Sequence, residues 1–332
     1  MTPTKRLFLS IGEPMVELGR AERTDAQDTS LWRMGYAGDV LNTLWYARAC
    51  LPAEAEESGW TTSLFTRLGP DPFSEGLKSF LTRNGIDTSY VQTDPKRSVG
   101  LYAIELLDGG ERRFSYWRSD SAARLLANDA DALRAAAKAA DVVYASGITL
   151  AILPNEGRER VIACLAEAKA DGRLAVFDPN IRPALWESED ALRFWLREGC
   201  RAASVGLPSF EDEAALFGDA SVEECALRWL DWGSDEVVVK NGGAKMAIAA
   251  AGARVETLEV ERTQALDTTG AGDSFNGGYL ASRLMGTTRR EAAMRGHMLA
   301  ANVVRHRGAL ISMTEAGKHM ACSPVPEARH PT

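Results

Sequence analysis

The residues best suited to chemistry stand together in one short stretch, Asp267-Thr268-Thr269-Gly270-Ala271-Gly272-Asp273-Ser274-Phe275. Its residues 270–272 carry almost no side chain, and the apolar spacing that follows predicts an amphipathic helix over 274–284. A bare loop at a helix N-terminus directs backbone N–H groups and the positive end of the helix dipole at one point, which suits a phosphate. Asp273 could then accept a proton from a hydroxyl that attacks this phosphate. The alternative is that Asp273 only caps the helix, a role that aspartate fills well.

In the second half of the chain, predicted helices alternate with predicted strands. These elements would form the framework that holds such a loop in place. Helices are expected at 129–140, 155–170, 188–199, 211–217, 221–232, 273–285 and 289–306. Strands are expected at 141–147, 174–178, 202–206 and 236–240, followed by an antiparallel pair at 246–250 and 254–260. This alternation predicts an α/β fold with a doubly wound, mostly parallel sheet and helices on both faces. Since active sites of such sheets lie at the carboxyl ends of strands, the polar residues just past those ends are candidates for a site.

The first third of the chain departs from this rhythm. A strand is expected at 6–12 and extended segments at 13–20 and 31–36, and 98–107 and 111–118 alternate around a glycine-containing turn. The last two segments predict a β-hairpin that projects from the main sheet. Its second strand carries arginines and aromatic residues, which suit a sugar-like ligand with a negative group. The alternative is a hairpin that forms a dimer, and both roles can hold.

Two helices are also predicted in this region. One opens at 37–42 and runs to Cys50, with Asn42 one turn inside it, where Asn42 could face a ligand or satisfy local backbone groups. The other is capped by Asp71 and ends at Asn84-Gly85.

Composition excludes several classes of function. The 332 residues carry a net charge of −8 with no run of five basic residues, which argues against nucleic acid or an anionic membrane as a partner. The five cysteines are scattered, odd in number and form no C-x-x-C, so we expect reduced thiols and no metal cluster. The first apolar run, 7–11, is too short for a signal peptide, and no stretch approaches the ~18 apolar residues of a membrane span. A cytoplasmic location is therefore expected.

The stretch DTTGAGDSF resembles the C-terminal signature of the ribokinase-like (PfkB) carbohydrate kinases, whereas neither a Walker A loop nor a Rossmann glycine motif occurs in the chain. Five further stretches are similar to the 2-keto-3-deoxygluconate kinase branch of that family: 37–43, 100–105, 110–118, 146–153 and 177–186. The resemblance covers nearly the whole chain. It implies a single kinase domain over 1–320, with lid segments at 14–37 and 96–118 and a flexible tail at 321–332.

The resemblance also implies a role for each matched position. In the family the small residues of the signature form an anion hole for the γ-phosphate and the final aspartate is the general base, here Gly270, Ala271, Gly272 and Asp273. The residues expected to bind the sugar are Gly38, Asp39, Asn42, Tyr102, Tyr116, Arg118, Arg182 and Asp273. The residues expected along the nucleotide are Asn180, Arg182, Lys240, Asn241, Gly243, Gly270 and Gly272.

The metal sites implied by the resemblance are less well matched. Many relatives use an N-x-x-E motif to organise Mg²⁺-bound water, but this chain has Ser209 and Asp212 at those positions, so either Asp212 or Glu213 could serve. Asp267 and Thr269, with carbonyls near Gly308, match the positions that bind a monovalent cation such as K⁺ in some relatives. The first signature also begins Ala37-Gly38 instead of Gly-Gly, which reduces backbone freedom at position 37.

The reaction implied is transfer of the γ-phosphoryl group of ATP to the 6-hydroxyl of 2-keto-3-deoxygluconate, in a homodimer formed through the lid or a larger homo-oligomer. One alternative is another PfkB sugar kinase, a fructokinase or ribokinase, whose neutral substrate would need no cationic partner. Another is a non-catalytic sensor of sugar acid or nucleotide, but such a protein would be expected to have lost Asp273 or the glycines beside it.

Overall fold

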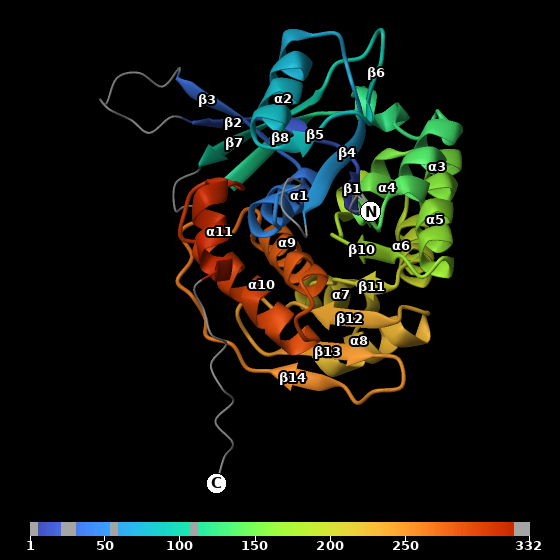
Figure 1. Ribbon diagram of the computed structural model, residues 1–332, viewed down its shortest axis with the longest axis vertical. Coiled ribbons are helices and arrows are strands. Elements are labelled where there is room, and N and C mark those ends of the chain that lie inside the picture. The colour runs from blue at the N-terminus through green and yellow to red at the C-terminus, as the bar shows by residue number, and fades with distance from the viewer. Residues whose placement is uncertain (1–5, 21–30, 54–58, 107–111, 322–332) are drawn as a thin grey trace. The chain divides into compact units, whose positions relative to one another are not determined.

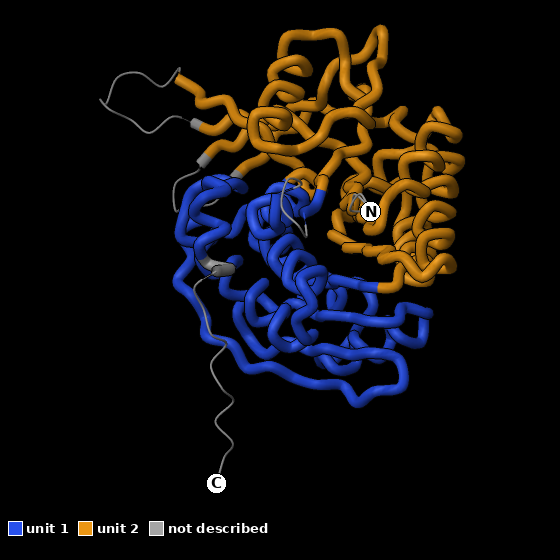
Figure 2. The backbone as a smooth tube through the Cα atoms, viewed as in Figure 1, with its two compact units in different colours: residues 1–5, 42–60, 205–332 blue, residues 6–41, 61–204 orange. Residues whose placement is uncertain are grey.

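The computed structural model describes residues 6–20, 31–53, 59–106 and 112–321 (Figure 1). They divide into two compact units (Figure 2): unit 1 holds 42–60 and the chain from 205 onward, and unit 2 holds 6–41 and 61–204. Across the described ranges, every helix is too short or too polar to cross a bilayer.

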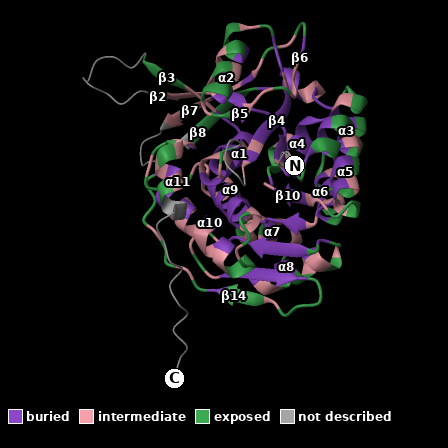
Figure 3. Cartoon of the chain, in the orientation of Figure 1, coloured by how far each residue is buried: buried purple, intermediate pink, exposed green. Residues whose placement is uncertain are grey.

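Unit 2 is built on a sheet with the strand order β10-β9-β1-β4-β5. Its strands are β1 (Arg6–Ile11), β4 (Trp60–Leu68), β5 (Ile86–Asp87), β9 (Val142–Ser146) and β10 (Leu174–Asp178), and β6 (Val91–Thr93) pairs with β4. The helices are α2 (Pro72–Arg83), α3 (Ala130–Ala139), α4 (Gly147–Ile152), α5 (Asn155–Ala170) and α6 (Glu189–Ala202). Two short 3₁₀ turns occupy Ala122–Leu125 and Pro183–Leu185. Strands β1, β9 and β10 pair in parallel and are buried almost throughout (Figure 3), as expected for a sheet covered by helices.

A second, four-stranded sheet in unit 2 has the order β3-β2-β7-β8 and is called the lid sheet after the lid segments predicted at 14–37 and 96–118. Its strands are β2 (Met15–Arg20), β3 (Trp32–Ala37), β7 (Gly100–Leu106) and β8 (Arg112–Trp117). Strands β2 and β7 pair in parallel, and the two outer pairs are antiparallel. The predicted hairpin and the two predicted extended segments therefore form one sheet, and its separation from the main sheet is confirmed. The turn expected at 108–110 lies outside the described residues.

Unit 1 contains the strand order β14-β13-β12-β11 and the C-terminal helices. The strands are β11 (Val205–Gly206), β12 (Glu236–Val239), β13 (Met246–Ala250) and β14 (Glu256–Leu258). The helices are α7 (Phe210–Phe217), α8 (Val222–Asp231), α9 (Ala271–Leu284), α10 (Arg289–Val303) and α11 (Met313–Ala321). Helix α1 (Asp39–Cys50) begins in unit 2 and continues through unit 1. The core of unit 1 includes fully buried Tyr46, Trp229 and Tyr279.

Local signals account for most element boundaries. Helix α2 begins after Asp71, whose side chain accepts from Phe73 N and Ser74 N at 3.1 and 3.0 Å, so the predicted cap is confirmed. Helix α5 and strand β10 have the predicted bounds.

Several elements differ from the predictions, most clearly two strands and two helices. The strand predicted at 202–206 is reduced to Val205–Gly206, because the apolar helical pattern of α6 continues through Cys200 and keeps Ala202 helical. The strand predicted at 254–260 is only Glu256–Leu258, where it pairs with β13. Helix α4 was not predicted because it has only six residues, although Ser146 caps it by accepting from Thr149 N. Helix α11 was also missed, and its last residue, Ala321, lies where the tail was expected to begin.

Candidate active site

The loop at 268–270 enters α9 with a geometry that glycine makes possible. Gly270 precedes the helix with φ of +74°, in the left-handed region, and a Cβ there would lie 2.7 Å from Ala309 O. Ser274 N donates to Gly270 O at 2.8 Å, which starts the helical hydrogen-bond pattern. Helix α9 therefore begins at Ala271, two residues earlier than predicted, and Gly272 and Asp273 lie in its first turn. The N–H groups of a first turn lack acceptors within the helix, so this turn can hold an anion.

Asp273 is held by a residue 231 positions earlier in the chain. Asn42 Nδ2 donates to Asp273 Oδ2 at 2.8 Å, and Asn42 is buried in α1. The close packing of α1 on α9 explains this contact, since a Cβ on Gly277 would lie 2.6 Å from Thr43 O. Asn42 was expected to contact the sugar; in this structure it orients the carboxylate that was expected to act as the base.

Lys240 lies at the end of β12, beside the same helix turn. Its Nζ donates to Asn276 Oδ1 at 3.0 Å, and a Cβ on Gly272 would lie 3.6 Å from that Nζ. The two following candidates form the turn after β12: Asn241 Nδ2 donates to Lys245 O at 3.1 Å, and Gly243 has a positive φ of 87°. Of the residues predicted to lie along the nucleotide, Lys240 is thus close to the first turn of α9. Asn241 instead stabilises the turn in which it lies.

Asp267 joins the loop to the segment after α10. Its Oδ1 accepts from Thr269 N and its Oδ2 from Gly308 N, both at 2.8 Å. Tyr46 of α1 strengthens the same region, because its hydroxyl donates to Ala309 O at 2.7 Å and accepts from Ile311 N at 3.1 Å. Hydrogen bonds therefore join three segments within unit 1. They are the segment after α10 around Gly308, the loop from Asp267 to Gly272, and helix α1, which carries Asn42.

The polar cluster of unit 2 centres on Asp39, the first residue of α1. Asn180 follows β10 with an unusual positive φ of 32°, and its Nδ2 donates to Asp39 Oδ2 at 3.1 Å. Burial raises the pKa of Asp39, while hydrogen bonds from Ser146 and Asn180 and the charge of Arg118 oppose that rise. Gly38 precedes it with φ of +147°, and a Cβ there would lie 2.5 Å from Glu13 O. The predicted sugar residues Gly38 and Asp39 are thus packed against the ends of β1, β9 and β10.

The aromatic candidates lie on one face of the lid sheet. Tyr102 and Tyr116 are directly paired across β7 and β8, with ring centroids 5.8 Å apart. Tyr102 is buried and its hydroxyl donates to Glu17 Oε2, whereas Tyr116 is 53% exposed. Arg182 is also exposed, and its Nη1 donates to Ile181 O at 2.7 Å. Tyr116 and Arg182 are therefore the unit 2 candidates that a ligand can reach with least rearrangement.

Arg118, by contrast, is paired inside the protein. It is only 8% exposed, and its Nε donates to Glu13 Oε2 at 2.8 Å, with Nη2 within ion-pair distance of the same oxygen. Glu13 is not among the site residues predicted from the sequence. The available signal was its position directly after a buried strand, the same criterion that selected residues after β9, β10 and β12.

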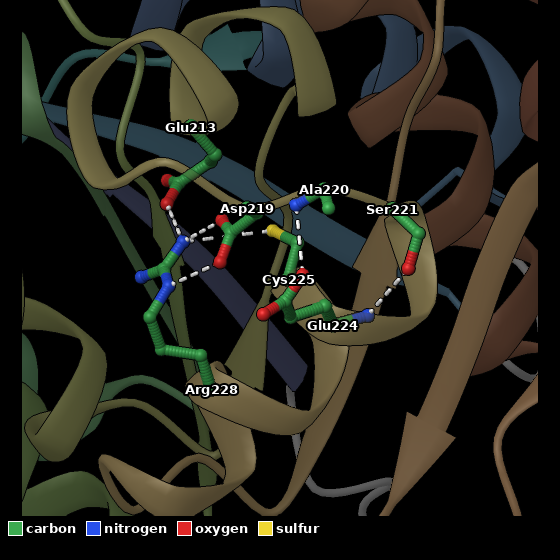
Figure 4. Close-up of polar contacts among 7 residues, drawn as sticks. All are labelled: Glu213, Asp219, Ala220, Ser221, Glu224, Cys225 and Arg228. Atoms are coloured by element: carbon green, nitrogen blue, oxygen red, sulfur yellow. Dashed lines mark hydrogen bonds and ion pairs between the residues drawn. The ribbon is translucent and has the colours of Figure 1, made fainter.

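The two carboxylates considered for Mg²⁺ have different surroundings. Figure 4 shows Glu213 pointing at Arg228, whose guanidinium also bonds Asp219 and lies near Cys225. Arg228 Nη2 donates to Glu213 Oε2 at 2.6 Å, Arg228 Nε donates to Asp219 Oδ1 at 2.8 Å, and Glu213 is fully buried. Asp212 on the same helix is half-buried. Although Glu213, Asp219 and Cys225 are close enough to share a cation, the arginine fills their centre, so we regard them as an ion-pair cluster.

The site thus has a carboxylate in the first turn of a helix, directly after a glycine loop, in an α/β fold. These features define a class of enzyme that transfers phosphoryl groups to small hydroxyl compounds. The chain belongs to the PfkB family of carbohydrate kinases, since the pfkB family carbohydrate kinase profile matches residues 5–316. The predicted family and the ribokinase-like α/β fold are thereby confirmed.

Individual relatives refine this assignment. The chain is 35% identical over 306 residues to the 2-dehydro-3-deoxygluconokinase of Escherichia coli strain K12, covering 91% of this chain and 96% of that protein. The 2-dehydro-3-deoxygluconokinase structure from Thermotoga maritima has a TM-score of 0.79 at 17% identity, covering 96% of this chain and 98% of that one. A putative ribokinase II from E. coli in complex with ATP and Mg²⁺ has a TM-score of 0.78 at 21% identity, covering 96% and 99%.

Proposed function

We propose that this kinase transfers the γ-phosphoryl group of ATP to the 6-hydroxyl of 2-keto-3-deoxygluconate, giving the 6-phospho sugar acid. The observation that carries the proposal is Asp273, held by Asn42 in the first turn of α9 beside the Gly270 loop. The choice of acceptor is supported by the 35% identical relative named 2-dehydro-3-deoxygluconokinase, which is another name for a kinase of this sugar acid.

In this mechanism Asp273 accepts the proton of the attacking hydroxyl, and its orientation depends on the amide of Asn42. The N–H groups of the first turn of α9 stabilise the negative charge on the transferring phosphoryl group, and Lys240 adds a positive charge from the end of β12. The chain therefore contributes positioning and charge, which is what phosphoryl transfer chiefly requires.

Mg²⁺, when bound with the nucleotide, would neutralise phosphate charge. Asp212 is the carboxylate that we propose to hold it through water, because Glu213 is engaged by Arg228. Asp267, Thr269 and the segment at Gly308 are proposed to hold a monovalent cation, since Asp267 already brings these backbone segments together. Comparing ADP release in K⁺, Na⁺ and neither salt tests this; equal rates would contradict it.

The substrate assignment is tested by ADP release across a panel of sugar acids and neutral ketoses. We expect 2-keto-3-deoxygluconate to give the highest kcat/KM. The chain is acidic overall, so a sugar acid needs local cations, for which Arg118 and Arg182 are the candidates. A preference for fructose or ribose would overturn the acceptor assignment and leave the family assignment standing.

We also propose that the kinase is a homodimer through its lid sheet. Because side chains alternate between the two faces of a sheet, Tyr102 and Tyr116 lie on one face and a shallow apolar concavity lies on the other. The concavity is lined by Leu18, Trp32, Ala103, Glu105, Ser115 and Trp117, with Trp117 60% exposed. An exposed apolar sheet face of this kind suits association with a second copy.

Light scattering should therefore give about twice the 36.0 kDa of one chain. The variant Trp117→Lys should shift the mass toward the monomer, and a wild-type mass near that of one chain would contradict the proposal. The cytoplasmic location stays a prediction.

A further inference from the structure

Glu13 and Arg118 form a buried ion pair that joins the end of β1 to the end of β8. The pair is 105 residues apart in sequence, with Glu13 2% and Arg118 8% exposed. Nε of Arg118 donates to Oε2 of Glu13, and Nη2 lies within ion-pair distance of the same oxygen but makes no hydrogen bond to any described residue. The other oxygen, Oε1, is buried and has no hydrogen-bond partner among the residues that the structure describes. Leaving buried charged groups without hydrogen bonds is costly, and here both partners of the ion pair keep one such atom, Oε1 of Glu13 and Nη2 of Arg118.

The surroundings hold the carboxylate of Glu13 in one position. A Cβ on Gly100 would lie 2.6 Å from Oε1 and 3.2 Å from Met15 Cγ, so the absence of a side chain at Gly100 makes room for the carboxylate. The backbone carbonyl of Glu13 lies against Gly38, next to Asp39. Glu13 thus contacts the turn proposed to bind the sugar through its backbone and Arg118 through its side chain.

The bonds also determine which part of the guanidinium remains for a ligand. An arginine presents two edges that can each bond a carboxylate through two N–H groups. Glu13 accepts a hydrogen bond from Nε, whereas Nη1 and Nη2 have no hydrogen-bond partner among the described residues. The edge formed by Nη1 and Nη2 therefore carries the N–H groups that still lack an acceptor, although Nη2 itself is buried.

We propose that Glu13 is a positioning residue for substrate specificity: it fixes Arg118 so that the Nη1 edge receives the carboxylate of the sugar acid. This inference rests on the proposed function, because it assumes an acidic acceptor. Glu13 does not touch the substrate, and it acts by the placement of its carboxylate rather than by its charge.

Two variants separate placement from charge. Glu13→Asp keeps the charge but shortens the side chain by one methylene, about 1.5 Å, which is enough to break a hydrogen bond of ordinary length. Glu13→Gln keeps the length and an oxygen that accepts from Arg118, but removes the charge. We expect E13D to raise KM for 2-keto-3-deoxygluconate about tenfold or more, the effect of losing a charge-assisted hydrogen bond, and E13Q to remain within about threefold of wild type. The kcat, the KM for ATP and the KM for a neutral ketose should change little in both.

The controls exclude a purely structural effect. Glu167→Asp shortens a carboxylate that pairs with another arginine, Arg134, away from the proposed sites, and should leave KM for the sugar acid unchanged. In an Arg118→Met background, E13D should add no further rise in KM, since the two residues act as one unit. Arg118→Lys gives a second route if E13D fails to fold, because an ammonium keeps the charge but cannot present two edges; it should raise the same KM.

The outcomes distinguish this inference from the proposed function. If the wild-type enzyme prefers neutral ketoses in the acceptor panel, the proposed function and the role of Glu13 are both overturned before any variant is made. A wild-type enzyme that prefers the sugar acid, with E13D unchanged in KM or with E13Q as impaired as E13D, overturns the role of Glu13 alone. A lower KM in E13D would show that Glu13 competes with the substrate for Arg118, which also overturns it.

Discussion

The ion pair between Glu213 and Arg228 connects α7, the helix that carries Asp212, to α8, and the titration of Glu213 tests the energetics of this pair. The carboxylate of Glu213 and that of Asp219 share one guanidinium, and Asp219 occupies both Nε and Nη2 while Glu213 meets only Nη2. Burial opposes the charge of Arg228, but the two carboxylates outweigh it and raise the pKa of the guanidinium. For Glu213 the balance is reversed: burial raises its pKa to about 7, against the attraction of Arg228.

The sign of the pH dependence follows from this shift. Below pH 4.5 the carboxyl of Glu213 is protonated in both the folded and unfolded states, and above pH 7 it is ionised in both. Between these values the folded state binds more protons, so the free energy of unfolding falls as pH rises. The two pKa values, 4.5 and about 7, differ by about 2.5, and at about 1.4 kcal/mol per unit this corresponds to roughly 3 kcal/mol.

Glu213→Gln removes this titration while keeping the shape of the side chain. We expect the free energy of unfolding of E213Q, minus that of the wild type, to increase by about 3 kcal/mol between pH 5 and pH 8. Urea unfolding at a series of pH values measures this difference, and titrations common to both proteins cancel from it. Glu211→Gln, an exposed carboxylate lost from the same helix, is the matched control. A flat difference, or a wild type that gains stability relative to E213Q as pH rises, would refute the reasoning.

The remaining predictions concern the phosphoryl-transfer site. Asp273→Asn should lower kcat by about 10²–10⁴, the usual share of general-base catalysis, with the KM for ATP near normal; turnover like that of the wild type would exclude Asp273 as the base. Gly272→Val should impair phosphoryl transfer because a β-branched side chain crowds the first turn of α9, whereas Gly272→Ala, whose Cβ would make only an ordinary 3.6 Å contact with Lys240 Nζ, should be milder. A folded and fully active G272V would mean that the loop does not hold phosphate. Arg182→Leu should lower kcat for acidic and neutral acceptors alike, and a loss confined to sugar acids would instead assign Arg182 to carboxylate recognition.

Much of this protein could be predicted from local sequence. The alternation of apolar helices and strands gave the α/β class, and the bounds of α5 and β10, because burial periodicity and capping are encoded within a few residues. The lid sheet was recognised because alternating segments interrupted that rhythm. Asp273 was found for the same local reason, since a bare loop followed by an acidic residue and a helix is visible in one stretch of chain.

The tertiary structure alone decided which polar groups meet. Asn42 binds Asp273 across 231 residues, Arg118 pairs with Glu13 across 105, and Glu213 pairs with Arg228 of another helix. No local pattern encodes these partners, because they depend on helix packing and strand order, which bring distant segments within hydrogen-bond distance. The same reason explains why the bounds of β11 were predicted wrongly and α11 was not predicted. A two-residue strand is defined by its pairing with a neighbouring strand, and a short helix is stabilised by the surface on which it packs. The sequence therefore determined the fold and the reactive loop, whereas the partner of each charged side chain was decided only when the chain was folded.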